Sequence, residues 1–172
     1  MNAVGKLGAT MADLLDHHAI TELYRCYADA LDEGPIDRWP TFFTEDASYR
    51  VIPRSNADRG LALATMWCQG RPMMLDRVNA LKGANFFLSR RIRHLVGPLG
   101  VSQVQELTPR RRWTVIANFA VFETLALEPT RVIACGRYED TVEEQPDGSL
   151  LFVDKRCLND TDLVANSLVY PF

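Results

Sequence analysis

Residues 39–51 read Trp39-Pro40-Thr41-Phe42-Phe43-Thr44-Glu45-Asp46-Ala47-Ser48-Tyr49-Arg50-Val51. Three large aromatic side chains enter a turn at the start of this run. Ser48 to Ile52 then form a short segment rich in residues that favour strands, and Pro53 closes it. We interpret the run as a corner that leads into the first strand of a sheet.

A helix is predicted immediately upstream of this corner. Its apolar residues recur at three- and four-residue spacing, which puts them on one helical face; they are Ile20, Leu23, Tyr24, Tyr27, Ala28 and Leu31. Gly34-Pro35 ends the helix, because glycine tolerates the left-handed cap and proline cannot continue the hydrogen-bond ladder. One more short helical turn from Ile36 to Trp39 would deliver Phe42 and Phe43 against the apolar face. Phe43 is therefore expected to join this helix to the sheet.

The rest of the chain divides into a second helix and a strand-rich half. Residues 72–83 are predicted as a helix, 54–60 as a loop, and 61–68 as a strand in preference to a helical piece. Extended runs separated by turn residues fill the second half; they are 86–96, 111–125, 130–144 and 150–159. Asp147-Gly148 supplies the positive φ that a tight hairpin needs.

The order of these elements indicates the fold class. Odd positions from Trp113 to Val121 form one apolar row, which is predicted to face the helices. Helices first and strands afterwards, without βαβ alternation or repeats, indicate an α+β domain whose curved antiparallel sheet wraps around the N-terminal helices. A length of 172 residues fits one domain, 1–172, in which residues 1–12 form a loose arm and Thr10 or Asp13 caps the first helix.

Charge and composition exclude several kinds of partner. A net charge of -3 argues against nucleic acid, whose phosphates require a basic surface. No apolar run approaches the roughly 18 residues of a membrane helix, and residues 1–6 lack the apolar region of a secretion signal. The four cysteines form no C-x-x-C pair and are expected to be free thiols. A cytoplasmic protein is therefore expected.

Metal and cofactor sites lack the residues that they need. A Rieske centre takes two cysteines and two histidines in C-x-H and C-x-x-H pairs, and no cysteine here precedes a histidine in that way. A mononuclear iron site takes two histidines and a carboxylate, yet the neighbours His17 and His18 would point about 100° apart on a helix. Nucleophile and phosphate-binding motifs are also missing. We predict no metal, cofactor or catalytic residue in this chain.

Acid-base chemistry is the alternative, with Tyr27, Asp46, Tyr49 and His94 as candidates. Each has a structural interpretation as well. Tyr27 lies on the apolar helix face, Asp46 follows a turn, and Tyr49 would pack in the first strand. His94 stands out, although it lies among arginines that would discourage its protonation.

The N-terminal part of the chain resembles the cone-shaped α+β domains related to nuclear transport factor 2. The resemblance rests on Asp16, Ala19, Ile20, Leu23, Tyr24, Tyr27, Ala30, Leu31, Asp32, Trp39, Phe42, Phe43, Asp46 and Tyr49. That superfamily contains dehydratases and isomerases, such as scytalone dehydratase, ketosteroid isomerase and polyketide cyclases. It also contains the small (β) subunits of Rieske-type aromatic-ring-hydroxylating dioxygenases.

Two motifs further along favour the dioxygenase subunits. Asp76-Arg77-Val78-Asn79-Ala80-Leu81 and Arg91-Ile92-Arg93-His94-Leu95-Val96-Gly97 resemble the D-R-[VI]-x-A-L helix and R-x-R-H strand of these β subunits. The aromatic corner and the segment Trp67 to Arg93 look most similar to small subunits of oxygenases for aromatic acids. Terephthalate dioxygenase is the favoured subgroup, with salicylate, benzoate and anthranilate oxygenases as relatives.

The resemblance implies a structural role within a larger oxygenase of three α and three β subunits. The α subunit would carry the Rieske [2Fe-2S] cluster and the mononuclear Fe(II), with electrons from NAD(P)H through a separate reductase. Structural or subunit-interface candidates in this chain are Arg91, Arg93, His94, Trp39 and Phe43. The alternative is a stand-alone dehydratase or isomerase of the polyketide cyclase or scytalone dehydratase type, which uses His94 with Asp46 and tyrosines.

Strand alternation predicts which face of the strand each side chain of this motif occupies. Arg91 and Arg93 should share one face of their strand, with Ile92 and His94 on the other. Two guanidinium groups on one face are costly unless carboxylates or carbonyls meet them. Such partners are expected either within the domain or on the α subunit.

Overall fold

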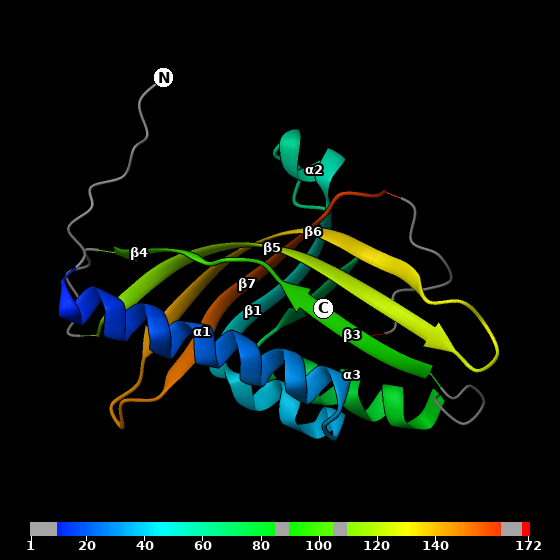
Figure 1. Ribbon diagram of the computed structural model, residues 1–172, viewed down its shortest axis with the longest axis horizontal. Coiled ribbons are helices and arrows are strands. Elements are labelled where there is room, and N and C mark those ends of the chain that lie inside the picture. The colour runs from blue at the N-terminus through cyan, green and yellow to red at the C-terminus, as the bar shows by residue number, and fades with distance from the viewer. Residues whose placement is uncertain (1–9, 85–89, 105–109, 163–169) are drawn as a thin grey trace.

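The computed structural model describes residues 10–84, 90–104, 110–162 and 170–172 (Figure 1). Helices occupy the first half of the chain and strands dominate the second. The elements in chain order are α1 (Met11–Asp32), the 3-10 helix η1 (Ile36–Phe42), β1 (Phe43–Pro53), α2 (Arg54–Asp58), β2 (Met66–Gln69), α3 (Arg71–Ala84), β3 (Arg90–Val96), β4 (Gly100–Val104), β5 (Arg112–Leu125), β6 (Arg131–Glu144) and β7 (Leu150–Asn159).

One sheet contains all seven strands in the order β2-β1-β7-β6-β5-β3, and β4 also pairs with β5. Every pair is antiparallel except β1 and β7, which run parallel, with Tyr49 opposite Lys155. The expectation of an entirely antiparallel sheet is wrong at this pair. A parallel pair needs a long crossover, and here the chain from α2 through β6 supplies it.

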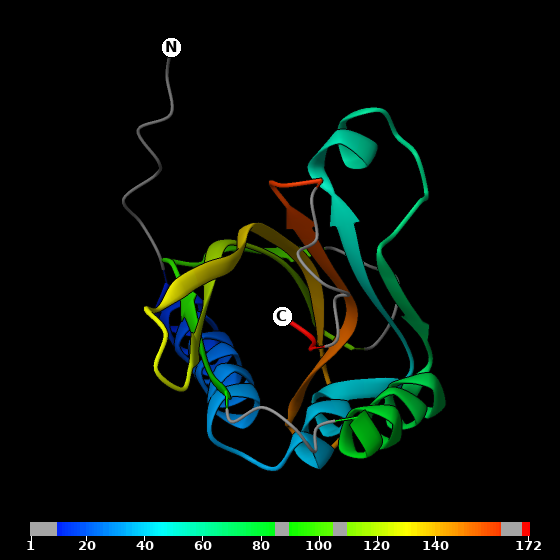
Figure 2. The same ribbon diagram turned by 90° about the vertical axis from the view of Figure 1, so that its right-hand side faces the viewer.

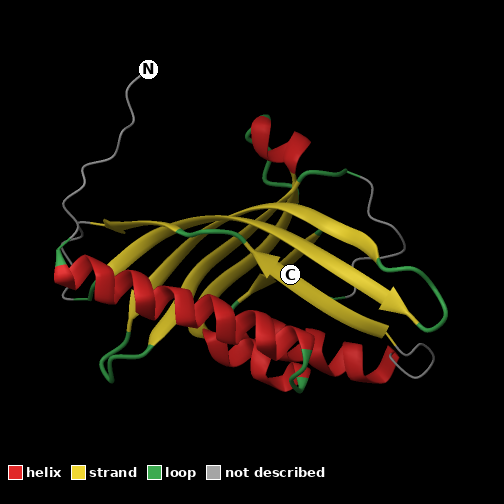
Figure 3. Ribbon diagram, in the orientation of Figure 1, coloured by secondary structure: helices red, strands yellow, loops and turns green. Residues whose placement is uncertain are grey.

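The sheet curves around a cone in which α1 and α3 lie on one side, whereas the short helix α2 lies beyond the opposite side (Figures 2 and 3). Helix α1 packs against β3 and β7, whereas α3 packs against η1, β1 and β2. No described helix lies over the outer face of β5 and β6, and the C-terminal residues 170–172 enter the mouth of the cone. The α+β architecture with a wrapped sheet is confirmed.

The first helix begins where the sequence provides a cap. The Thr10 hydroxyl accepts from the Asp13 N–H at 3.1 Å, and the Asp13 carboxylate accepts from the Thr10 N–H at 2.8 Å. This reciprocal capping box fixes the start of α1 at Met11. The last two residues of the expected arm 1–12 are therefore helical, and residues 1–9 lie outside the described residues.

The second half of the chain matches the predicted strands closely. All members of the odd row on β5 are buried, in the same core cluster as the apolar face of α1: Trp113, Val115, Ala117, Phe119 and Val121. Gly148 has a φ of 82°, and the Gln145 N–H donates to the Ser149 carbonyl oxygen at 2.8 Å. The hairpin between β6 and β7 is therefore confirmed. Residues 86–89 of the predicted strand 86–96 lie outside the described residues.

Three short stretches differ from the prediction. Residues 61–65 of the predicted strand 61–68 are not in a strand, and β2 begins only at Met66. Residues 54–58, expected to be loop, form the helical turn α2, which Arg54 and Ser55 tie to Asp160 and Asp162 through side-chain hydrogen bonds. Strand β4 was not predicted because its sequence is polar and short. It forms because the chain turns after Val96, opposite Phe119, and meets β5 again with Gly100 opposite Ile116.

Candidate functional site

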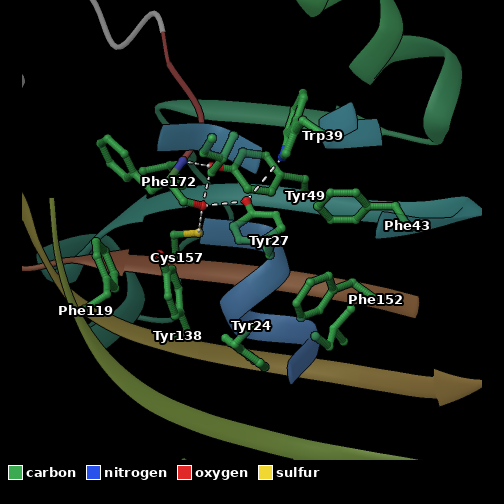
Figure 4. Packing of buried hydrophobic residues seen from close by; sticks show 14 of the residues in the cluster. Tyr24, Tyr27, Trp39, Phe43, Tyr49, Phe119, Tyr138, Phe152, Cys157 and Phe172 are labelled. Carbon is green, nitrogen blue, oxygen red and sulfur yellow. Dashed lines mark hydrogen bonds between the residues drawn. The ribbon is translucent and has the colours of Figure 1, made fainter. Parts of the chain in front are cut away.

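The interior of the cone is filled by aromatic side chains (Figure 4). Trp39 and Phe43 are fully buried, with ring centroids 5.7 Å apart. The Phe43 ring also lies 6.1 Å from Tyr27 on α1 and 5.6 Å from Phe152 on β7. Phe43 therefore joins the first helix to the sheet as predicted. Both candidates are core residues of this chain and offer no surface to another subunit.

The two candidate tyrosines of the interior are held by structural hydrogen bonds. The Tyr27 hydroxyl donates to the Phe172 carbonyl oxygen at 2.6 Å and accepts from Trp39 Nε1 at 3.2 Å. The Tyr49 hydroxyl accepts from the Phe172 N–H at 2.7 Å. Burial raises the pKa of both phenols well above the usual value. Their hydroxyls thus tie the segment at Phe172 into the cone and are poor proton donors near neutral pH.

A buried ion pair lies beside these rings. The Lys155 ammonium donates to Asp140 Oδ2 at 2.8 Å, and both side chains have 0% exposure. The Tyr24 hydroxyl also donates to Asp140 Oδ2, and the Arg156 N–H donates to Oδ1 at 3.1 Å. The sequence analysis missed this cluster. Strand alternation in β6 could have indicated it, because Asp140 lies on the same strand face as the buried Tyr138.

Aromatic rings complete the surroundings of Lys155. The ammonium lies 3.6 Å from the ring centroid of Tyr138 and 4.6 to 4.8 Å from those of Tyr24, Tyr27 and Phe152. Burial raises the pKa of the Asp140 carboxyl, while Lys155 and the two hydrogen bonds oppose that effect. A cation, a carboxylate and a phenol in contact resemble a catalytic set. Neither charged side chain is exposed, so no substrate can reach them. The cluster therefore has a structural role in the interior.

The His94 side chain enters the seam between α1 and β3. Its Nδ1 lies 2.6 Å from Asp32 Oδ1, and its backbone N–H donates to Asp32 Oδ2 at 2.9 Å. A carboxylate only accepts, so Nδ1 carries the proton. Nε2 is buried and has no hydrogen-bond partner among the described residues. The pair borders a hollow of about 270 Å³, which is also lined by Tyr24, Arg25 and Val96.

The expected neighbours of His94 are therefore corrected. Asp46 is exposed and borders a different hollow, with Arg71 and Glu143, so it does not join His94. Asp32 is the ionic contact of the imidazole, and the Arg93 guanidinium, on the other strand face, lies 3.8 Å from the same carboxylate. The sequence analysis counted Asp32 among the N-terminal residues that carry the family resemblance, but it assigned Asp32 no role.

Arg91 and Arg93 share one strand face, as predicted, and this is the outer face of β3, but the two side chains differ in their contacts. The Arg93 guanidinium lies 2.5 Å from Glu33 Oε1 and 3.8 Å from Asp32 Oδ2. Arg91 is exposed and makes no ion pair or side-chain hydrogen bond with another residue in the described part of the chain. Among the described residues, carboxylates therefore pair with Arg93 but not with Arg91.

Titratable side chains do not gather in the pattern of a metal site. Within residues 10–84, 90–104, 110–162 and 170–172, no three His, Cys, Asp or Glu residues come together as possible ligands. All four cysteines are free thiols. No described helix combines the length and apolar character that crossing a bilayer requires.

Comparison with known proteins identifies the family. Residues 27–166 match the family model described as ring hydroxylating beta subunit. The chain belongs to this family. It is 32% identical over 159 residues to the anthranilate 1,2-dioxygenase small subunit of Burkholderia cepacia, covering 92% of this chain and 96% of the relative. It is 28% identical to the terephthalate 1,2-dioxygenase terminal oxygenase component subunit beta 2 of Comamonas sp., covering 92% and 99%.

A solved structure agrees with this assignment. The crystal structure of a protein assigned as the β subunit of an aromatic-ring-hydroxylating dioxygenase, from Novosphingobium aromaticivorans, is 31% identical with a TM-score of 0.82. The match covers 94% of this chain and 99% of that one. The resemblance stated from the motifs is thus confirmed, and so is the cone fold related to nuclear transport factor 2.

Proposed function

We propose that this chain is the β subunit of the terminal oxygenase of an aromatic-ring-hydroxylating dioxygenase, and that it supports an α subunit that performs the hydroxylation. The observation that carries the proposal is the match of residues 27–166 to the ring hydroxylating beta subunit family. The described interior supports it, because Trp39, Phe43 and Phe172 are buried in one core cluster. The hydroxyls of Tyr27 and Tyr49 are bonded within the chain.

The cofactors are assigned to the partner. The described residues do not provide a ligand set for a Rieske cluster or a mononuclear iron. We therefore place both iron centres in the α subunit, with NAD(P)H oxidised by a separate reductase. Three α and three β subunits in a cytoplasmic complex complete the proposal. The role of this chain is to hold that assembly together, and none of its side chains is assigned to catalysis.

The substrate class follows from the relatives. Two relatives carry the names of anthranilate and terephthalate dioxygenase, and both of those substrates are aromatic carboxylic acids. The anthranilate relative is the more similar of the two, at 32% against 28% identity. The identities therefore do not support the terephthalate preference drawn from the motifs. We propose an aromatic acid as the substrate of the complete oxygenase.

Co-expression with the α subunit tests the proposal. The two chains should purify as one complex that contains iron and turns over an aromatic acid in the presence of its reductase. The chain by itself should be colourless and free of iron. Stoichiometric iron in the isolated chain, or failure of the two chains to associate, would contradict the proposed function.

A second candidate function rests on the seam of His94 and Asp32. An imidazole oriented by a carboxylate beside a hollow of about 270 Å³ is an arrangement that general acid-base catalysis uses. A dehydratase or isomerase activity of the isolated chain, lowered roughly a hundredfold by His94→Gln, would favour this function. His17→Gln is the matched control, since His17 is exposed on α1 and its Nε2 lies 3.2 Å from the Leu99 carbonyl oxygen.

A further inference from the structure

The outer face of β3 carries an exposed patch of mixed character. Strand pairing sets Arg93 opposite Phe122 of β5 and Phe122 opposite Val132 of β6, so these side chains form one row across three strands. Leu95, which is 56% exposed, and Arg91 flank this row on β3, and Val132 is 55% exposed. We call these five residues the outer β3 patch: Arg91, Arg93, Leu95, Phe122 and Val132.

This patch has no cover within the described chain. Helices α1 and α3 lie on the other side of the sheet, and α2 lies at the far end of β1 (Figures 1 and 2). Leucine, valine and phenylalanine side chains in a contiguous group, bordered by arginine, match the composition of protein interfaces, in which arginine and large apolar residues are enriched. A water-facing sheet surface would instead carry mainly polar residues, as Arg50, Asp154 and Glu139 do further along this same face.

Arg91 indicates the charge of the missing partner. It has no carboxylate partner among the described residues. Asp32 and Glu33 border the same hollow as Arg91, but their carboxylates are bound to His94 and Arg93. A carboxylate of another chain is therefore the partner that Arg91 lacks.

The geometry points to the outer β3 patch as the surface on which the α subunit docks, with a carboxylate against Arg91 and apolar side chains against Leu95, Phe122 and Val132. This inference rests on the proposed function, which supplies the partner. A second copy of this chain fits less well. The patch itself contains no carboxylate, so a two-fold contact between copies would offer Arg91 no acidic partner.

A competition experiment tests the docking surface. Affinity-tagged α subunit is co-expressed with equal amounts of wild-type chain and one variant, and the ratio captured gives their relative affinities. Arg91→Glu and Leu95→Glu should each be captured at least about tenfold less than wild type, as expected for residues central to an interface. The control is Leu63→Glu. Leu63 is 67% exposed, just before β2 at the opposite edge of the sheet, and its capture should fall less than about threefold.

Salt dependence identifies the contribution of charge. Capture of the wild type should weaken with rising salt, and Arg91→Ala should weaken less steeply because its ion pair is absent. Thermal melts check that each variant is folded. Arg91→Glu removes no ion pair or hydrogen bond with a described residue, so this variant should stay folded. It can therefore test the docking surface even if Leu95→Glu is unstable.

The outcomes separate the docking surface from the proposed function. Capture of Arg91→Glu and Leu95→Glu equal to that of Leu63→Glu would overturn the docking surface while leaving the proposed function intact. Variants that abolish self-association of the isolated chain without changing capture would assign the patch to a second copy and overturn it too. Failure of the wild-type chain to be captured at all would instead contradict the proposed function.

Discussion

The aromatic interior and the seam between α1 and β3 use polar groups in opposite ways. In the interior, the Lys155 ammonium lies 2.8 Å from Asp140 Oδ2 and is surrounded by rings, and both charged side chains are fully buried. In the seam, the imidazole of His94 is bonded at Nδ1 but has no partner at Nε2 among the described residues, and Arg93 is 53% exposed. The interior buries its charged pair completely, whereas the seam leaves the Arg93 side chain partly exposed.

This difference separates the requirements of folding from those of assembly. A buried charge without a partner costs several kcal/mol, so the interior tolerates no loss of either member of its ion pair. Exposed ion pairs such as Arg93 with Glu33 contribute little, and changes there should leave the fold intact. Variants of the interior should therefore unfold the chain, and variants of the seam and the outer β3 patch should alter what the folded chain does.

Replacing Lys155 gives the strongest test of this comparison. Lys155→Met leaves Asp140 buried without its cation, and we expect a loss of about 3 to 5 kcal/mol in the free energy of unfolding. Urea denaturation measures it. The double variant with Asp140→Leu should recover most of the loss, because it removes both charges. No recovery would show that the packing of the Lys155 side chain, and not the unpaired carboxylate, causes the loss.

Phe43→Ala should destabilise the chain by a similar amount. The substitution removes a fully buried ring that contacts Tyr27, Trp39 and Phe152, and the expected cost is about 3 to 5 kcal/mol. A thermal melt checks it, with Phe43→Leu as the milder control, expected to cost under about 1.5 kcal/mol. An unchanged melting temperature for Phe43→Ala would mean that this ring is not part of the core.

His94→Gln should have a smaller effect. The imidazole loses its 2.6 Å contact with Asp32, although the backbone N–H of residue 94 still donates to that carboxylate. We expect a loss of about 1 to 2 kcal/mol in stability. Turnover of the assembled oxygenase, normalised to its iron, should stay close to wild type under the proposed function. A large loss per iron in a correctly assembled complex would give this chain a part in the chemistry.

The smallest expected effect is a change in stability that depends on pH. The Arg111 guanidinium donates to Glu144 at 2.8 Å and holds the pKa of that carboxyl below its usual value. A lowered folded-state pKa stabilises the fold above the unfolded pKa of about 4.3, and the contribution is lost as pH falls through the folded value. Both groups are partly exposed, so Arg111→Ala should cost under about 1 kcal/mol at pH 7.

Denaturation at two pH values measures the contribution of Arg111, which also donates to the Asp16 carboxylate at 2.9 Å. The difference between wild type and Arg111→Ala should shrink below about pH 3, where the carboxylates are protonated in both states. Lys82→Ala is a suitable control. Lys82 pairs with Asp37 on an exposed surface, where a small effect is also expected. A difference that persists unchanged in acid would show that Arg111 acts by packing on Trp113.

The sequence predicted those elements whose residues alternate or recur with a clear period. The face of α1, the odd row of β5 and the Asp147-Gly148 hairpin are all confirmed. Helix α2 was missed because one polar turn has no period, and β4 because its five residues depend on pairing with β5. The parallel pair of β1 and β7 was missed because local pattern carries no information on which distant strands meet.

The site residues were less predictable than the fold. Arg91 and Arg93 could be placed on one strand face by alternation alone. The contact of His94 with Asp32 could not be foreseen, because it depends on how the end of α1 lies against β3. Lys155 stands in Asp154-Lys155-Arg156, a run that reads as exposed, and only the register with β6 reveals that this one charge points inward.

The parallel pairing of β1 with β7 also means that the sheet cannot be completed until the last strand has been synthesised. Protein synthesis adds about 5 to 20 residues per second, so the last strand leaves the ribosome roughly 5 to 20 seconds after the first. During that interval β1 lacks its parallel neighbour, and Phe43 lacks the ring of Phe152 on which it packs. Such delayed, long-range pairing slows folding and exposes apolar surface to aggregation. Nascent chains that end before residue 150 should therefore depend on chaperones.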